Sequence, residues 1–580
     1  MWGVELHLIL ILPMNGTKPG GKLSRCSRYF APTSKTLTTL MLHNQHIADL
    51  GGLLERRGIR HVIISPGSRN APLIQLFTSH PAFTCYSIVD ERSAGYVALG
   101  MARQLREPVV VVTTSGTSVL NLSPAVAEAF HQHIPLVILT ADRPLEKISR
   151  FNNQVIDQEA PYFNHSKGFI QLPFELRTRQ ELKRALAAVG QLLDEAARPL
   201  PGPVHVNIGL QEPLYEKLPE PLPELSKTMS PPVLNEDKPG LIPEMVHKKV
   251  LLLAGMGSHE EEIATLLTRL SSSFNVVVIA ENIANLHSEL FITCPELLLA
   301  GANERELKDL APDVVISFGG QVVSKRLKLF LESVNGAVHM EVEGNPRSVL
   351  DELGIAGESG NGAGYNRYLE RWKEIESRES ERADTYLADA PYSIFTVIRK
   401  ILTEVPGGTV VHLGNSSTIR YSQLIPVRHD LVYYSNRGTS GIDGSVSAAV
   451  GAAMVSDDLH LLLVGDLSFV YDSNAMWNQH FPGNLKIVVL NDGGGGIFRL
   501  LKGPDQMEFF EEFSVTHHPV SLELLSQAFG RVFLRADHMK EVEEKMAHLF
   551  QSGTQADILE VDATESENSR IFKEFFNLNH

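Results

Sequence analysis

The sequence is poor in cysteine and has no long apolar run. Its three cysteines, Cys26, Cys85 and Cys294, lie too far apart along the chain to suggest a metal-binding spacing or a disulfide framework. This scarcity favours a reducing, cytoplasmic setting. No apolar run reaches the length of a membrane span, which argues against a membrane-spanning protein.

Positive charge is scarce relative to negative charge. Lys and Arg total 52 against 68 Asp and Glu, which gives a formal net charge of −16. This acidic balance argues against a nucleic-acid-binding protein, although it leaves room for a local basic pocket. Because 580 residues are too many for a single core, we expect about three domains.

The first 36 residues do not fit the pattern of the rest of the chain. A short apolar run at 6–12 follows Glu5 and has no basic segment before it, so the segment makes a poor signal peptide. We expect residues 1–36 to be a disordered extension, or an upstream extension of the reading frame with Met41 as an alternative start.

Apolar runs and amphipathic segments alternate in three blocks, 37–214, 215–385 and 386–580. This alternation predicts an α/β protein with a doubly wound parallel sheet in each block. A proline-rich connector at 218–243 and a polar, helical segment at 355–385 are expected to link the blocks. The expected strands are 61–65, 84–89, 109–113, 136–140, 204–208, 249–253, 275–280, 314–318, 337–342, 410–413, 431–435, 461–464, 485–490 and 556–561.

The stretch 461–498 carries the clearest chemical pattern. A strand ends at Gly465-Asp466, a helix is expected at 471–480, and a second strand ends at Asn491-Asp492 before four glycines. Ligands of parallel sheets bind outside the carboxyl ends of the strands. Side-chain oxygens suit Mg²⁺, and glycines let the backbone approach a phosphate. The pattern therefore indicates a metal–diphosphate site, although such turns also occur in other α/β proteins.

Acidic and basic residues also follow other expected strands. Glu91 comes after the strand 84–89 and opens a helix, a position that also suits an ordinary acid at a helix N-terminus. Arginine binds carboxylates through two parallel hydrogen bonds, so several arginines at loop positions predict a pocket for an anionic organic acid. The basic and neighbouring polar residues are Ser68, Arg69, Arg143, Gln154, Lys325, Arg326, Arg420 and Arg437.

These motifs resemble those of thiamine diphosphate-dependent enzymes. The acids and glycines of 465–496 resemble the diphosphate fingerprint, with Leu467 in place of a glycine and Asp492 in place of the second asparagine. DERSAGYVALGMAR resembles the segment that carries the catalytic glutamate. From about Met41 onward, the chain resembles the 2-succinyl-5-enolpyruvyl-6-hydroxy-3-cyclohexene-1-carboxylate synthase family of menaquinone biosynthesis. The segments that carry this resemblance are SPGSRN, DERSAG, ADRP, NQVIDQ, SKR, GNSSTIR, SNRGTSGIDG, GDLSFVYD and GGGIFRLL.

The resemblance implies a transferase that uses thiamine diphosphate with Mg²⁺, or with Mn²⁺ in its place. The implied reaction is the decarboxylation of 2-oxoglutarate and the conjugate addition of the resulting succinyl-semialdehyde carbanion to isochorismate. The three blocks would be a pyrimidine-binding domain (37–214), a central domain (215–385) and a diphosphate- and metal-binding domain (386–580). The family also implies a homodimer or a dimer of dimers, with active sites at the subunit interface.

The resemblance assigns roles residue by residue. Glu91 matches the glutamate that activates the cofactor, and Asp466, Asp492 and the Gly494 carbonyl match the metal ligands. Asn491 stays open as the second ligand, because counting from either end of the motif gives different answers. Cofactor contacts are matched by Glu91, Asn415, Ser416, Gly441, Ile442, Gly465, Asp466, Leu467, Ser468 and Ile497. Substrate contacts are matched by Ser68, Arg69, Arg143, Gln154, Lys325 and Arg326 for isochorismate, Arg420 and Arg437 for 2-oxoglutarate, and Ser416 and Phe498 at the reaction centre.

Two other hypotheses remain at this stage. Another thiamine diphosphate-dependent enzyme, such as an acetolactate synthase or a 2-oxoacid decarboxylase, would accept pyruvate and need fewer arginines. A non-catalytic scaffold of the same fold would usually have lost Glu91 or Asp466, and both are present. A nicotinamide dehydrogenase is disfavoured, because no GxGxxG follows the first expected strand.

Overall fold

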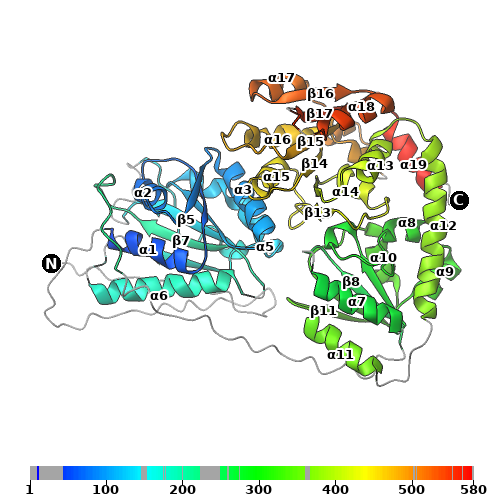
Figure 1. Ribbon diagram of the computed structural model, residues 1–580, viewed down its shortest axis with the longest axis horizontal. Coiled ribbons are helices and arrows are strands. Elements are labelled where there is room, and N and C mark those ends of the chain that lie inside the picture. The colour runs from blue at the N-terminus through cyan, green and yellow to red at the C-terminus, as the bar shows by residue number, and fades with distance from the viewer. Residues whose placement is uncertain are drawn as a thin grey trace. The chain divides into compact units, whose positions relative to one another are not determined.

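The computed structural model describes three sheets with helices around them (Figure 1). The chain divides into two compact units, of which the first is Met1–Leu234 with Val450–Ser456 and Asn474–Pro482, and the second is the remainder. The described residues are 10–11, 44–144, 153–173, 176, 178–198, 200–222, 248–257, 260–273, 275–358, 366–500, 503, 506–551, 553–554, 556–564 and 566–577. The expected N-terminal extension, apart from 10–11, and most of the proline-rich connector lie outside them.

The first unit contains a seven-stranded sheet in the order β1-β6-β7-β5-β4-β2-β3. The parallel prediction is confirmed for β2 to β7, whereas β1 is an edge strand that pairs antiparallel with β6. The strands are β1 (Leu10–Ile11), β2 (His61–Ile64), β3 (Thr84–Ser87), β4 (Val109–Thr113), β5 (Leu136–Asp142), β6 (Gly168–Leu172) and β7 (Val204–Gly209). The helices are α1 (Gln45–Arg56), α2 (Ala71–Ser79), α3 (Glu91–Leu105), α4 (Thr117–Asn121), α5 (Ser123–His131) and α6 (Arg179–Ala196).

The second sheet is parallel, in the order β11-β10-β8-β9, and helices cover both of its faces. Alternate strand residues enter two different cores: Leu252 packs with α7 and α11, and its neighbour Leu251 packs with α10 and α12. Because both faces of this sheet are buried, its strands are continuous apolar runs in the sequence. The elements are β8 (Val250–Ala254), α7 (Glu261–Ser273), β9 (Val276–Ala280), α8 (Pro295–Gly301), α9 (Glu304–Leu310), β10 (Val314–Phe318), α10 (Lys325–Ser333), β11 (Val338–Val342), α11 (Arg347–Glu358) and α12 (Arg367–Asp389).

The third sheet is also parallel, in the order β13-β12-β14-β15-β17-β16. Its central strands β14 and β15 are buried along almost their whole length, as the two apolar runs of the sequence predict. The strands are β12 (Val410–Leu413), β13 (Val432–Tyr434), β14 (His460–Gly465), β15 (Leu485–Asn491), β16 (Val532–Ala536) and β17 (Ala556–Asp562). The helices are α13 (Ile394–Glu404), α14 (Ser417–Ser422), α15 (Ser445–Ala453), α16 (Asp466–Tyr471), α17 (Leu522–Ala528), α18 (Met539–Leu549) and α19 (Asn568–Asn577).

Two local predictions are wrong. The helix expected at 471–480 is instead α16, which begins directly at Asp466, followed by the 3-10 helix η6 (Ser473–Met476). An acid in the first turn is favoured by the helix dipole, so the helix starts where the strand ends. The polar segment at 355–385 is not only a surface helix, because α12 buries Trp372 completely and continues to Asp389.

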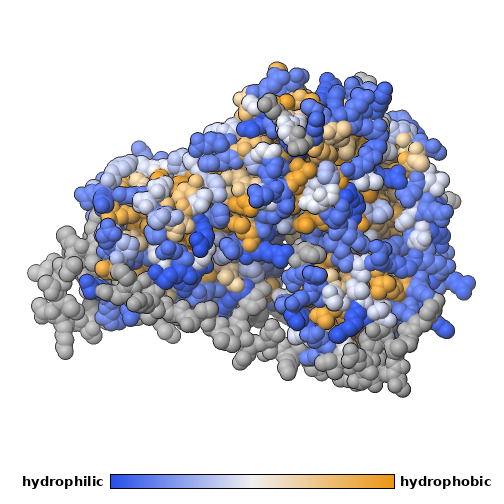
Figure 2. All heavy atoms as spheres, in the orientation of Figure 1, coloured by the Kyte–Doolittle hydropathy of each residue, from blue (hydrophilic) through white to orange (hydrophobic). Residues whose placement is uncertain are grey.

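Hydrophilic residues cover most of the described surface on the face in Figure 2, and apolar residues appear there in scattered patches. Among the described residues, no helix combines the length and the apolar character needed to cross a bilayer.

Candidate active site

The carboxyl ends of β12, β14 and β15 lie side by side at one edge of the third sheet. Strand β14 pairs with both neighbours, and Gly465 at its end stands opposite Leu490 of β15. Asp466 follows Gly465, and the Asn491-Asp492 pair follows Leu490 at the end of β15. The fold therefore brings both ends of the 461–498 pattern to the same edge, where parallel sheets bind ligands.

The carboxylates of Asp466 and Asp492 are close enough to influence each other. Asp466 is 1% exposed, and its Oδ1 accepts a hydrogen bond from the Leu467 N–H at 2.9 Å. Burial raises the pKa of Asp466 to about 6, although the N–H groups of Leu467 and Gly494 act in the opposite direction. Burial, and then the nearby Asp466 carboxylate, raise the pKa of Asp492 to about 7. Two partly neutralised acids in one place form a site that a cation would stabilise.

The structure distinguishes Asn491 from Asp492. The Asn491 amide donates from Nδ2 to Glu560 Oε1 at 2.6 Å, and its Oδ1 accepts from the Gly493 N–H at 3.0 Å. Its side chain is therefore occupied on both sides. The Asp492 carboxylate instead lies over Gly496, where an added Cβ would be 1.9 Å from Oδ2. Of the two candidates for the second metal ligand, Asp492 is the one with a carboxylate, and the charge of Asp466 acts on it.

The glycines after β15 pack against the segment 511–518, which begins with a π-helical turn, η9 (Glu511–Val515). Gly494 has a φ of 138°, and an added Cβ would lie 2.5 Å from the carbonyl oxygen of Val515. The Gly495 N–H donates to that same oxygen at 2.5 Å. Only glycine fits the position of residue 494, so the glycine run is required by the backbone as well as by any ligand.

Gly494→Ala is expected to destabilise the cofactor-free protein. Both the positive φ and the close Val515 carbonyl oppose a Cβ, and such strain costs roughly 1–3 kcal/mol. The melting temperature should fall by several degrees in a thermal scan. Gly483→Ala is the matched control, because no atom lies within 4 Å of its added Cβ. Equal melting temperatures for the two variants would contradict the strain at Gly494.

Two adjacent histidines, which no sequence motif predicts to lie here, contact this site. His518 Nε2 lies 3.2 Å from Asp466 Oδ2, and His517 Nδ1 lies 2.6 Å from the Gly493 carbonyl oxygen. Burial lowers the pKa of His518. The histidines stand some fifty residues after Asp466 and match no motif, so only the fold brings them to it.

The ends of β12 and β13 are joined by the Asn415 side chain. Its Nδ2 donates to the carbonyl oxygens of Asn436 at 2.7 Å and Gly441 at 2.6 Å, and its Oδ1 accepts from Arg437 Nη1 at 2.9 Å. Ser416 has a φ of 74° and a ψ of −126°, a conformation that a residue with a side chain rarely adopts. Backbone strain of this kind often marks functional sites.

The other predicted residues of the second unit differ in exposure. Gly465 is the N-cap of α16, and Leu467 and Ser468 lie in its first turn. Ile497 is buried in the 3-10 helix η7 (Gly496–Leu500), whereas Phe498 is 38% exposed. The remaining exposed members are Lys325, Arg326, Arg420 and Ile442.

In the first unit, Glu91 is the first residue of α3 and is half-buried. Its Oε2 accepts a hydrogen bond from Asn121 Nδ2 at 3.1 Å. The preceding Asp90 caps the helix by accepting from the Ser93 N–H at 3.0 Å, and it also accepts from Asn474 Nδ2 at 2.5 Å. Sequence reasoning missed Asn121, which lies 30 residues away at the end of α4 and belongs to no motif.

The basic residues of the first unit follow β2 and β5. Arg69 is 5% exposed and donates to the Leu210 carbonyl oxygen at 3.2 Å and to Glu212 Oε1 at 3.1 Å. Arg143 follows β5, and its N–H donates to Asp142 Oδ1 at 2.7 Å. Two predicted residues, Ser68 and Gln154, are exposed, whereas Arg143 is half-buried.

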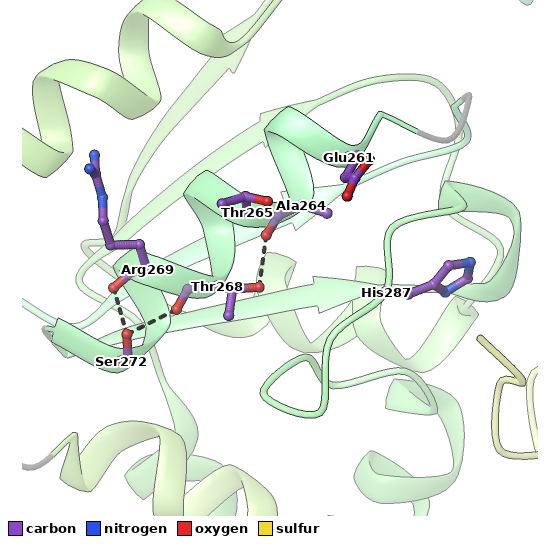
Figure 3. A pocket seen from close by; sticks show the side chains of 7 residues that line it. All are labelled: Glu261, Ala264, Thr265, Thr268, Arg269, Ser272 and His287. Carbon is purple, nitrogen blue, oxygen red and sulfur yellow. Dashed lines mark hydrogen bonds between the residues drawn. The ribbon is translucent and has the colours of Figure 1, made fainter. Parts of the chain in front are cut away.

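The predicted residues thus fall into two groups. The first unit holds Ser68, Arg69, Glu91, Arg143 and Gln154, and all of the others belong to the second unit. A separate pocket of about 480 Å³ runs along α7 and contains none of them. Figure 3 shows its lining, with Glu261, Ala264, Thr265, Thr268, Arg269 and Ser272 on α7 and His287 on a facing loop.

Two family models match the chain. Residues 47–161 match the thiamine pyrophosphate enzyme, N-terminal TPP binding domain, and residues 414–559 match the thiamine pyrophosphate enzyme, C-terminal TPP binding domain. The first range contains Glu91, and the second contains the Asp466–Asp492 edge. Both parts of the candidate site therefore lie within the ranges that match these two models.

Similar proteins extend this match over most of the chain. A protein of Desulfotalea psychrophila named 2-succinyl-5-enolpyruvyl-6-hydroxy-3-cyclohexene-1-carboxylate synthase is 40% identical over 511 residues, covering 85% of this chain and 94% of its own length. Relatives of the same name from Flavobacterium johnsoniae and Porphyromonas gingivalis are 35% and 34% identical, and cover 90% and 91% of this chain and 96% of their own lengths. With its motifs, its three α/β sheets and these relatives, the chain belongs to the 2-succinyl-5-enolpyruvyl-6-hydroxy-3-cyclohexene-1-carboxylate synthase family of thiamine pyrophosphate enzymes.

Proposed function

We propose that the protein decarboxylates 2-oxoglutarate and adds the remaining four-carbon unit to isochorismate, releasing CO₂ and forming 2-succinyl-5-enolpyruvyl-6-hydroxy-3-cyclohexene-1-carboxylate in menaquinone biosynthesis. The observation that carries the proposal is the pair of carboxylates, Asp466 and Asp492, which follow paired strand ends and interact electrostatically beside the glycine loop of a chain in this family. The relatives cover nearly the whole chain, which disfavours an acetolactate synthase or a scaffold.

We propose that Asp466, Asp492 and the Gly494 carbonyl hold Mg²⁺, with Mn²⁺ as a substitute. The donor set fits, because it consists of oxygens and carries two carboxylates, as hard cations prefer. The adjoining turn fits a diphosphate, because an added Cβ at Gly465 meets no atom within 4 Å and leaves its backbone open to approach. The occupied amide of Asn491 supports Asp492 as the second ligand.

Thiamine diphosphate, when bound, supplies the electron sink that a decarboxylation needs and that protein side chains lack. The side chains of the protein have two roles, which are to hold and move a proton and to orient the anionic substrates. Glu91 offers its carboxyl group for the proton, and the hydrogen bond from Asn121 to Oε2 orients it. Asn415 holds Arg437 near the Gly441-Ile442 turn.

The basic residues take the substrate carboxylates. Arg420 and Arg437 bind 2-oxoglutarate in this proposal, beside Ser416 and Phe498. The isochorismate contacts are Ser68, Arg69, Arg143, Gln154, Lys325 and Arg326. Arginine is suited to this task because its planar fork donates two hydrogen bonds to one carboxylate.

We also propose a cytoplasmic homo-oligomer, a dimer or a dimer of dimers, with active sites at the subunit interface. The location of Glu91 and of the Asp466–Asp492 pair in separate units of the chain is compatible with sites completed by a second copy. The free thiols of Cys85 and Cys294 agree with a reducing compartment.

Donor choice tests the proposed function against other thiamine diphosphate enzymes. Purified protein with thiamine diphosphate and Mg²⁺ would be given 2-oxoglutarate or pyruvate, and decarboxylation would be followed with an artificial electron acceptor. The proposal predicts a kcat/KM at least about a hundredfold higher for 2-oxoglutarate, because a second carboxylate engages an arginine fork. Equal use of pyruvate would favour an acetolactate-type enzyme.

Metal binding is expected to weaken as the pH falls from 8 to 6. Asp492 and Asp466 have raised pKa values, about 7 and about 6, so protons compete with the metal in this range. The Mg²⁺ concentration for half-maximal thiamine diphosphate binding should rise about tenfold, since each pH unit below a pKa removes about nine-tenths of the carboxylate. Calorimetric titrations at several pH values would measure it.

The stability of the metal-free protein is expected to change with pH in the opposite direction to metal binding: it rises as the pH falls. Acids whose pKa is raised by folding stabilise the folded state when protonated, so the metal-free protein loses this contribution as the pH rises through 6 and 7. Asp492→Asn is the matched control and should flatten both dependences. A Mg²⁺ affinity that stays constant between pH 6 and 8 would contradict the pairing of the two acids.

A further inference from the structure

The loop after β9 is a buried polar segment that contains none of the predicted site residues. Residues 281–285, called here the β9 loop, contain the 3-10 helix η5 (Asn282–Ala284). The side chains of Glu281, Asn282 and Asn285 are 2%, 2% and 0% exposed. Buried charged and amide groups are costly unless they are hydrogen-bonded. Their hydrogen-bond partners therefore show what the loop holds in place.

Glu281 holds the start of α10. Its Oε2 accepts from the Val323 N–H at 2.6 Å, and its Oε1 accepts from the Ser324 N–H at 2.7 Å. Ser324 is the N-cap of α10, because its Oγ accepts from the Leu327 N–H at 3.1 Å. Both carboxylate oxygens are thus spent on the backbone that immediately precedes Lys325.

A second carboxylate supports the same helix start. Glu296 Oε2 accepts from Ser324 Oγ at 2.7 Å and from the Arg326 N–H at 3.0 Å, and its Oε1 lies 3.3 Å from Arg326 Nε. Burial raises the pKa of Glu281 to about 7, while its two backbone donors act in the opposite direction. The pair Lys325–Arg326 is therefore anchored from behind, although both of its side chains are exposed.

Asn282 connects the same loop to α14. Its Nδ2 donates to Ser422 Oγ at 3.0 Å, and its Oδ1 accepts from Gln423 Nε2 at 2.7 Å. Ser422 is the last residue of α14, the helix that carries Arg420. The β9 loop thus also fixes the end of the helix that bears one of the basic residues of the third sheet.

Asn285 connects the loop to β13. Its Nδ2 donates to the Tyr433 carbonyl oxygen at 2.9 Å, and its Oδ1 accepts from the Tyr433 N–H at 2.7 Å. Strand β13 is at the edge of the third sheet, so the amide supplies the pairing that a neighbouring strand would give. This strand leads directly to Arg437.

We propose that the β9 loop is a positioning element, which fixes the pair Lys325–Arg326 relative to Arg420 and Arg437. The proposal rests on the proposed function, which takes these residues as contacts for isochorismate and 2-oxoglutarate. Joining two substrates requires their reacting atoms to be held about 3–3.5 Å apart, and a misplacement of about 1 Å costs about 10²-fold in rate. The three buried side chains of this five-residue loop therefore position the proposed contacts for both substrates.

Two variants test the isochorismate contacts and the 2-oxoglutarate contacts separately. Glu281→Gln replaces one acceptor by an amide N–H₂ that cannot accept from the backbone, and it should raise the KM for isochorismate about tenfold. The KM for 2-oxoglutarate should stay within about twofold, because Asn282 and Asn285 still hold α14 and β13. Asn282→Ala should give the reverse pattern. Initial rates with each substrate varied in turn measure both constants.

Further variants keep the test decisive. Glu296→Gln alters the same helix start from a more accessible side chain and should repeat the rise in the isochorismate KM even if Glu281→Gln folds poorly. Glu306→Gln is the matched control, because Glu306 is 5% exposed and accepts from the Asn303 N–H at 3.0 Å without touching a predicted site residue. It should lower the melting temperature and leave both KM values unchanged.

The outcomes that overturn the proposal are distinct from those that overturn the function. Equal rises of both KM values in Glu281→Gln and Asn282→Ala, or a lower melting temperature with unchanged KM values, would show a merely structural loop. A wild-type protein that does not consume isochorismate would instead overturn the proposed function, and the positioning role with it.

Discussion

Glu91→Gln is expected to lower kcat by about 10²–10⁴-fold, the range for loss of a positioned general acid–base group. Glutamine has nearly the same size, so the amide can still meet Asn121, which now donates to Glu91 Oε2 at 3.1 Å. It cannot hold or release a proton at neutral pH. Thiamine diphosphate affinity, measured by calorimetry, should change far less than kcat, measured with both substrates saturating.

Two companions show whether the loss belongs to the carboxyl group. Glu107→Gln changes an exposed acid of the same domain and should leave kcat unchanged. Asn121→Ala removes the hydrogen bond to Glu91 and should lower kcat by a smaller factor, because the carboxyl group remains but is less well oriented. A wild-type kcat in Glu91→Gln would refute the role of Glu91.

Asp466→Asn should raise the Mg²⁺ concentration for half-maximal activity by about two orders of magnitude, since it removes one of two carboxylates from the metal site. The same substitution should raise the melting temperature of the metal-free protein above pH 7. Burial raises the pKa of Asp466 to about 6, so its ionised form destabilises the folded state there. An asparagine has no charge to bury. Activation by metal and thermal scans without metal measure the two effects.

The control for this prediction is a second group of possible ligands. Asp537, His538 and Glu541 lie together at the N-terminal end of α18, where His538 Nδ1 is 2.7 Å from Asp537 Oδ1. These side chains lie far more open to solvent than Asp466. Asp537→Asn should change neither the metal dependence nor the melting temperature of the metal-free protein. A loss of Mg²⁺ activation in Asp537→Asn, with none in Asp466→Asn, would move the metal site to α18.

The elements that the sequence could predict are those with a local signal. Every expected strand is present, and most of them are apolar runs of the right length that are buried, although the edge strands β3 and β11 are partly exposed. Strands β1, β6 and β16 were missed, and β1 contradicts the predicted disorder of residues 1–36 at Leu10–Ile11, which pair with β6. Strand β16 is partly exposed along most of its length, so its residues show no continuous apolar run.

The site was predictable only as far as its motifs reach. Asp466 and Asp492 follow strands, so their meeting at one sheet edge follows from the βαβ pattern. The partners Asn121, His518 and Glu281 come from distant parts of the chain and have no motif. Their contacts depend on packing between elements, which no local pattern encodes. The helix expected at 471–480 begins earlier, at Asp466, and here the cause is local: the helix dipole favours an acid in the first turn.

The most direct measurement follows isochorismate consumption by the purified protein, with product identification by mass spectrometry. The proposed function predicts consumption that requires 2-oxoglutarate, thiamine diphosphate and Mg²⁺ together, and a product that retains the isochorismate skeleton plus a succinyl group. Omission of any one component should abolish it, and the Glu91→Gln substitution should slow it by about 10²–10⁴-fold. Decarboxylation of 2-oxoglutarate with isochorismate left untouched would contradict the proposed acceptor, and the absence of any turnover or thiamine diphosphate binding would contradict the enzyme itself.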